Sequence, residues 1–91
     1  MMPYFAVICR DKPDSLDLRM QTRADHLRYA EESGVLFLGG PLIEDGRMAG
    51  SLAILDVADL DAAKAWAADD PYGKAGLFAS VEINEWKRVI G

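Results

Sequence analysis

The stretch VLFLGGPLIEDGRMAGSLAILDV, residues 35–57, lies at the middle of the chain and decides its fold. Its Glu-Asp-Gly-Arg segment at residues 44–47 has the composition of a hairpin turn, because Asp-Gly pairs tolerate the positive φ angles of two-residue turns. The apolar run at residues 35–38, which Gly-Gly-Pro then breaks, predicts a strand before the turn. Residues 50–57 predict a strand after it, so the centre of the chain is expected to be a β-hairpin.

A helix is predicted on each side of this hairpin. Apolar residues recur at spacings of three, four and seven from Leu16 to Ala30, the period of an amphipathic helix, and Gly34 marks its end. The Ala-rich segment at residues 60–68 has high helix propensity and stops before Pro71, where residues 70–73 predict a turn.

Two outer strands, at residues 3–10 and 77–86, complete the pattern, since both segments are rich in aromatic and branched residues. The order is strand, helix, strand, strand, helix, strand. It predicts an α+β fold with a ferredoxin-like βαββαβ antiparallel sheet. With 91 residues the chain has room for one domain, which we expect to span residues 1–91.

Both faces of the predicted sheet are apolar. In the first strand Phe5 and Val7 point to one side while Tyr4, Ala6 and Ile8 point to the other, and the later strands show the same pattern. Two helices on the same side of a sheet cover only one face. The second face is therefore expected to pack against another copy of the chain, giving a two-fold homodimer.

Composition excludes several classes of protein. With 10 Lys and Arg against 15 Asp and Glu, the chain has a net charge of −5 and scattered basic residues, which argues against nucleic-acid binding. The apolar run that follows Pro3 is too short for a signal peptide or a membrane span. The lone Cys9 cannot form an internal disulfide, which suits the cytoplasm. The one His, one Cys and scattered carboxylates have no spacing typical of a metal site.

The single histidine, His26, lies on the first predicted helix. At about 100° per residue, Leu16, Met20 and Leu27 are expected to face the sheet, and an adjoining stripe carries the polar side chains. Arg23 lies almost within the apolar stripe and must find a partner or a water-filled pocket. His26 lies one turn later and is expected to face the same pocket. The alternative is that His26 only makes a structural hydrogen bond. The stripe comprises Arg19, Arg23, His26 and Ala30.

Asp70 is the second candidate for chemistry. An acid before a proline commonly caps a turn by accepting a bond from a backbone N–H. In this topology, however, both helices lie on one face of the sheet, so the end of the second helix can approach the middle of the first. A carboxylate beside His26 would fix the tautomer of the imidazole and make the pair a general acid or base.

Several of these residues also carry a resemblance to a known family. The chain resembles the YciI-like (YCII-related) family over nearly its whole length. This resemblance implies a ferredoxin-like subunit of a dimeric α+β barrel, with an active site built around His26 and Asp70. The matching motifs are Arg23-x-x-His26, Gly39-Gly40-Pro41-Leu42, Gly50-Ser51, and Asp69-Asp70-Pro71-Tyr72 running into Ala75-Gly76-Leu77-Phe78.

Two hypotheses follow. In the first, the chain is a small cofactor-free enzyme in which His26, oriented by Asp70, moves a proton during an elimination or isomerisation of a small anionic or phenolic substrate. In the second, the chain is a non-catalytic homodimer that binds a small ligand or is purely structural, and the His26–Asp70 pair only joins two helices. The residues expected around a ligand are Arg23, Gly40, Pro41, Ser51 and, at the pocket mouth, Tyr72.

Overall fold

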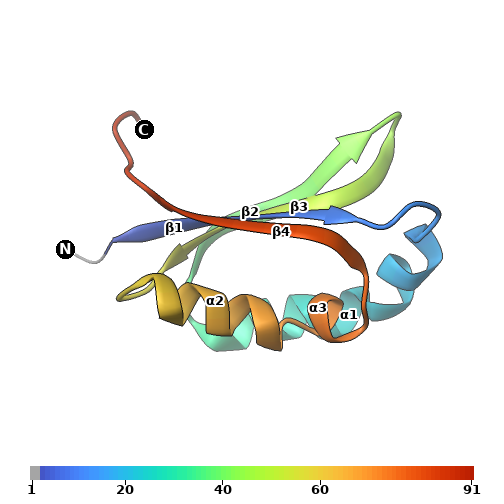
Figure 1. Cartoon of the computed structure of the whole chain (residues 1–91), viewed down its shortest axis with the longest axis horizontal. Coiled ribbons are helices and arrows are strands. Elements are labelled where there is room, and N and C mark those ends of the chain that lie inside the picture. Colours follow the sequence, from blue (N-terminus) through green and yellow to red (C-terminus); the bar gives the residue numbers. More distant parts are fainter. Residues whose placement is uncertain (1–2) are drawn as a thin grey trace.

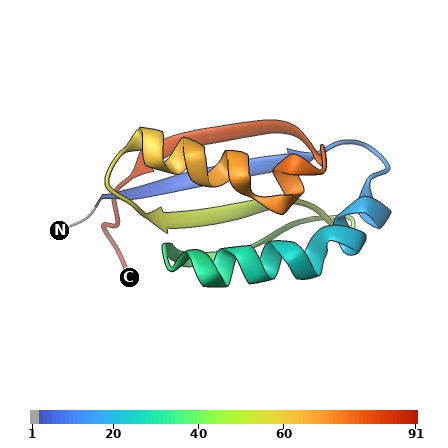
Figure 2. The same cartoon turned by 90° about the horizontal axis from the view of Figure 1, so that it is seen from below.

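The computed structural model describes residues 3–91 and contains one four-stranded antiparallel sheet with its helices on one face (Figures 1 and 2). The strand order in the sheet is β2-β3-β1-β4. This is an α+β fold with a ferredoxin-like antiparallel sheet, as the sequence predicts. In chain order the elements are β1 (Tyr4–Asp11), α1 (Leu16–Ser33), β2 (Leu36–Glu44), β3 (Arg47–Asp56), α2 (Leu60–Asp69), α3 (Pro71–Lys74) and β4 (Phe78–Trp86).

The central hairpin forms as predicted, with Asp45 and Gly46 at φ angles of 51° and 74° between β2 and β3. The expected break at Gly39-Gly40-Pro41 is wrong, because β2 runs through these residues and Pro41 is paired with Ser51. β2 is an edge strand, and a proline is tolerated there because its missing N–H does not interrupt a second ladder.

The segment after α2 also differs from the prediction. Residues 71–74 form the short helix α3 in place of a simple turn. Asp70 has extended backbone angles before Pro71, and its side chain accepts a hydrogen bond from the backbone N–H of Tyr72 at the start of α3. The carboxylate thus caps the new helix.

The face that α1 presents to the sheet differs from the expected one. Leu16, Met20 and Leu27 are 37, 51 and 47% exposed, whereas Arg19 and Ala30 are buried. The prediction assumed that the apolar stripe faces the core. It is wrong here because partners on β1 and β3 make burial of the Arg19 guanidinium possible.

Apolar and aromatic side chains join the helices to the sheet. The core is centred on Leu55 of β3 and Ala63 of α2, both fully buried. The Tyr29 hydroxyl donates to the Trp66 carbonyl at 2.7 Å, and the Trp66 indole donates to Ser33 Oγ at 3.1 Å. These two bonds fix α1 and α2 side by side.

The opposite face of the sheet carries aromatic residues, with Tyr4 stacked on Phe37 and tilted against Trp86. Simple alternation along β4 predicts Phe78 on this same face. Phe78 instead packs against the core on the helix side, because the β1–β4 register shifts between Arg10 and Asp11. No helix in the described part of the chain is long and apolar enough to cross a bilayer.

The fold makes a prediction at Gly50. A Cβ atom there would lie 2.3 Å from the backbone oxygen of Cys9 on the neighbouring strand, so the backbone would have to move. We expect Gly50→Ala to lower the free energy of unfolding by about 1–3 kcal/mol, the usual effect of overpacking. Denaturant unfolding measures this change.

The matched control is Gly40→Ala, since a Cβ at Gly40 meets nothing within 4 Å. Its stability is expected to stay within about 0.5 kcal/mol of the wild type. Equal losses in the two variants would contradict the close strand approach at Gly50.

Candidate active site

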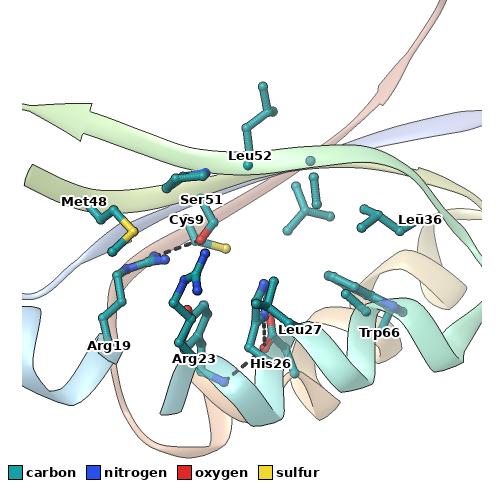
Figure 3. A pocket seen from close by; sticks show the side chains of 18 residues that line it. Cys9, Arg19, Arg23, His26, Leu27, Leu36, Met48, Ser51, Leu52 and Trp66 are labelled. Atoms are coloured by element: carbon teal, nitrogen blue, oxygen red, sulfur yellow. Dashed lines mark hydrogen bonds and ion pairs between the residues drawn. The ribbon is translucent and has the colours of Figure 1, made fainter. Parts of the chain in front are cut away.

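A cavity of about 110 Å³ lies between α1 and the sheet, with side chains from α1, β1, β2 and β3 around it (Figure 3). The junction of α2 and α3 closes one side through Asp70 and Tyr72. All seven site residues predicted from the sequence line this one cavity: Arg23, His26, Gly40, Pro41, Ser51, Asp70 and Tyr72.

His26 and Asp70 form a hydrogen-bonded pair. Nδ1 of His26 lies 2.8 Å from Oδ1 of Asp70, and the same carboxylate oxygen accepts the Tyr72 N–H at 3.0 Å. The sequence allows two interpretations of Asp70, a turn cap and a partner of the imidazole. The same oxygen atom, Oδ1, makes both of these contacts. With its side chain only 5% exposed, Asp70 depends on these bonds for its stability as a carboxylate.

This geometry assigns the proton on the imidazole ring. A carboxylate only accepts hydrogen bonds, so Nδ1 donates and the neutral ring carries its lone pair on Nε2. Nε2 makes no hydrogen bond. Among residues 3–91, every buried side-chain nitrogen or oxygen atom has a hydrogen-bond partner. Nε2 is therefore not buried and is accessible. Since His26 borders the cavity, Nε2 is the nitrogen available to a ligand.

Tyr72 is 1% exposed and lines the inside of the cavity, so the expected position at the pocket mouth is wrong. Its ring stacks on the His26 imidazole, with centroids 4.1 Å apart and planes 17° from parallel. Burial raises the pKa of Tyr72, while the charges of Arg19 and Arg23 act in the opposite direction. The phenol is therefore neutral near neutral pH.

Arg19 is the residue that sequence reasoning missed. Its guanidinium donates from Nε and Nη2 to the two oxygens of Asp11, at 2.6 and 3.0 Å, and from Nη2 to Ser51 Oγ at 2.8 Å. Burial alone would lower the pKa of Arg19, but the bond to Asp11 and its charge raise the pKa, so the side chain stays charged. The sequence did contain a signal for Arg19, because this residue lies seven positions before His26 on the same stripe of α1.

Arg23 lies between these groups on α1. Figure 3 shows its side chain directed from the helix into the cavity, between Arg19 and His26. Within residues 3–91 no carboxylate forms an ion pair with it. The residue as a whole is exposed, so its charge is not buried without a partner, which is the costly case that the sequence analysis considered.

Cys9 also lines the cavity but is not a nucleophile in this state. Burial, together with the negative charges of Asp70 and Asp11, raises the pKa of the thiol to about 12. The thiol is therefore protonated near neutral pH, and the thiolate is the reactive form. In the part of the chain that the structure describes, no group of His, Cys, Asp and Glu side chains has a geometry that would hold a metal ion.

Comparison with known proteins identifies the family. The model of the YCII-related domain matches residues 2–87. The chain belongs to the YCII-related family. Among curated relatives, Protein YciI of Escherichia coli O6:H1 is 34% identical over 96 residues, which cover 94% of this chain and 98% of the relative. An uncharacterised protein of Haemophilus influenzae is 34% identical over 97 residues, covering 96% of this chain and 99% of its own.

Solved structures add a relative with a described activity. The 5-chloro-2-hydroxyhydroquinone dehydrochlorinase TftG from Burkholderia phenoliruptrix AC1100, in complex with 2,5-dihydroxybenzoquinone, has a TM-score of 0.86 and 32% sequence identity. The similarity covers 94% of this chain and 95% of TftG. An antibiotic biosynthesis monooxygenase matches with a TM-score of 0.62 at 9% identity over 98% of this chain and 100% of its own, which shows a shared fold alone.

The His26–Asp70 geometry predicts the tautomer of the imidazole. At a pH where the ring is neutral, we expect the proton on Nδ1 in the wild type and a loss of this preference in Asp70→Asn, whose amide can donate as well as accept. The ¹⁵N chemical shifts of the single histidine report the tautomer directly.

Asp25→Asn is the matched control, because Asp25 is an exposed acid next to His26 on the same helix. It is expected to leave the tautomer unchanged. A wild-type proton on Nε2 would show that the bond to Asp70 is absent in solution.

Proposed function

We propose that this protein is a small cofactor-independent enzyme of the lyase or isomerase type. In this proposal His26, oriented by Asp70, takes up and delivers a proton through Nε2 on a small polar or phenolic substrate held in the cavity. The observation that carries the proposal is the 2.8 Å His26–Asp70 bond beside an accessible cavity. Residues 1–91 would act as one YCII-related domain in the cytoplasm, where a lone thiol such as Cys9 stays reduced.

Each polar group around the cavity has a role in this proposal. Asp70 holds the imidazole in one orientation and stabilises the imidazolium that forms when Nε2 takes a proton. Arg23 supplies a positive charge for a phenolate or enolate oxygen, and Ser51 supplies a hydroxyl. Gly40 and Pro41 form the wall of the cavity on the β2 side.

The similarity to TftG supports a phenolic substrate and an elimination. Loss of HCl from a chlorinated trihydroxybenzene needs a proton removed from a hydroxyl oxygen and one delivered to the ring carbon that carries chlorine. Chloride then leaves that carbon as a second hydroxyl proton is released and the ring becomes a quinone. One imidazole can serve as the base and then as the acid in these steps, so no metal or redox cofactor is required.

The proposal is tested with 5-chloro-2-hydroxyhydroquinone, followed by chloride release. We expect turnover by the wild type, no turnover above background for His26→Ala, and a decrease in kcat of about 10²- to 10⁴-fold for Asp70→Asn. The loss follows because the base is removed in the first variant and left without its orienting partner in the second.

Asp25→Asn, with its exposed side chain, is expected to keep wild-type activity. Wild-type turnover that survives in His26→Ala would overturn the acid–base role. Tight binding of 2,5-dihydroxybenzoquinone without turnover of phenolic substrates would favour the non-catalytic alternative. That alternative is also supported by the hydrogen bonds through which Asp70 links α1 to α3.

We further propose that the protein is a homodimer that covers the outer sheet face. This face lies away from the helices and carries Tyr4, Ile8, Leu52 and Trp86, with Trp86 37% exposed. An apolar sheet face that is only partly buried within one chain is typical of a surface that packs against another subunit.

Sedimentation equilibrium tests the dimer. We expect twice the chain mass for the wild type at micromolar concentration, and the chain mass for Ile8→Glu, because a charge at the centre of this face opposes packing. Val81→Glu places the same charge on an exposed site beside the helices and should remain dimeric. A monomeric wild type would contradict the proposal.

A further inference from the structure

We infer that Arg19 is a positioning residue that holds His26 and Ser51 in a fixed relation across the cavity. This inference rests on the proposed function and names a group that the proposed proton transfer does not itself use. It also specifies the chemistry of the ligand group on the Ser51 side of the cavity. The buried Arg19 guanidinium makes contacts in three directions, to Asp11, Ser51 and Tyr72.

Arg19 is itself fixed by Asp11. The two side chains are 3% and 6% exposed, and the guanidinium meets the carboxylate through two bonds, at 2.6 and 3.0 Å. Such a forked pair defines orientation as well as distance. Because either partner alone would be a buried unpaired charge, the pair has little freedom to separate. Arg19 is therefore anchored to the end of β1.

In one direction Arg19 orients Ser51. Its Nη2 donates to Ser51 Oγ at 2.8 Å, so a lone pair of that oxygen is occupied by the guanidinium. The hydroxyl hydrogen is then free to donate to another group, and Ser51 lines the cavity. Ser51 is thus set as a hydrogen-bond donor, and the ligand group that it fits is an acceptor oxygen such as a carbonyl, a phenolate or an enolate.

In another direction Arg19 acts on His26 through Tyr72. The guanidinium carbon lies 4.5 Å from the centroid of the Tyr72 ring, and that ring stacks on the imidazole at 4.1 Å. A cation against an aromatic face is a favourable contact of defined geometry. Tyr72 also donates its N–H to Asp70, the partner of His26. Displacement of Tyr72 would thus move both members of the His26–Asp70 pair.

Arg19 therefore connects the proton-transfer group with the oxygen-binding group, although it contacts neither His26 nor Asp70 by a hydrogen bond. A small misplacement of groups around a reacting centre can lower a rate by about 100-fold. We expect the effect in kcat, because Arg19 orients groups whose places matter most in the transition state.

The test uses Arg19→Lys, which keeps the charge but lacks the fork that meets Asp11, Ser51 and Tyr72 together. The expected result is a decrease in kcat of about 10- to 100-fold with KM within about threefold, together with a change in the NMR shifts of the His26 ring protons, which lie over Tyr72. Arg28→Lys, an exposed arginine on the same helix, is the matched control and should change neither.

A second variant keeps the test decisive if Arg19→Lys does not fold. The double variant Asp11→Asn, Arg19→Gln removes both buried charges together and leaves neither unpaired. Folded variants with wild-type kcat and unchanged His26 ring-proton shifts would overturn the inference and leave Arg19 with a structural role.

The NMR readout needs no substrate, so it separates this inference from the proposed function. Shifts of the His26 ring protons that move in a protein without turnover would show that the proposed function fails while the positioning role of Arg19 stands.

Discussion

One oxygen of the buried Asp70 carboxylate joins α1 to the segment where α2 ends and α3 begins. Oδ1 of Asp70 accepts from His26 on α1 and from the backbone of Tyr72 on α3. A carboxylate that is 5% exposed is stable only with such donors, so the packing of α1 against the α2–α3 junction and the presence of the His26–Asp70 pair are consequences of the same requirement. The residue that the proposed chemistry needs is thus also one that the fold needs.

A second buried acid, Asp11, forms an ion pair with Arg19, and the Arg19 guanidinium lies against the Tyr72 ring. Together the two acids allow α1 to present charged and polar side chains to the sheet where an ordinary amphipathic helix would present leucines. Leu16 and Met20 are correspondingly exposed, and Leu27 borders the cavity without filling it. A site that brings permanent charges close to an imidazole with one unbonded ring nitrogen is well suited to moving protons and to binding oxygen anions.

The sequence predicts the fold well because most of its elements are determined locally. The Asp45-Gly46 turn and the helix end at Gly34 are set by the backbone freedom of those residues, and both appear where expected. The continuous β2 could not be predicted, since Pro41 is compatible with a strand only at a sheet edge, and edge position is a property of the whole sheet. Similarly, the burial of Arg19 depends on Ser51, which is 32 residues away in the chain. The positions of His26 and Asp70 followed from topology and from the family resemblance, because helical periodicity alone places neither side chain against the other.

The most direct test of the central claim is a crystal structure of the protein with 2,5-dihydroxybenzoquinone, the molecule bound in the TftG structure. The geometry predicts the ligand in the cavity, with one of its oxygens within hydrogen-bond distance of Nε2 of His26 and another near Ser51 and Arg23, while Nδ1 remains bonded to Asp70. A ligand bound elsewhere, or a His26 ring turned so that Nε2 faces Asp70 or a sealed core, would contradict it.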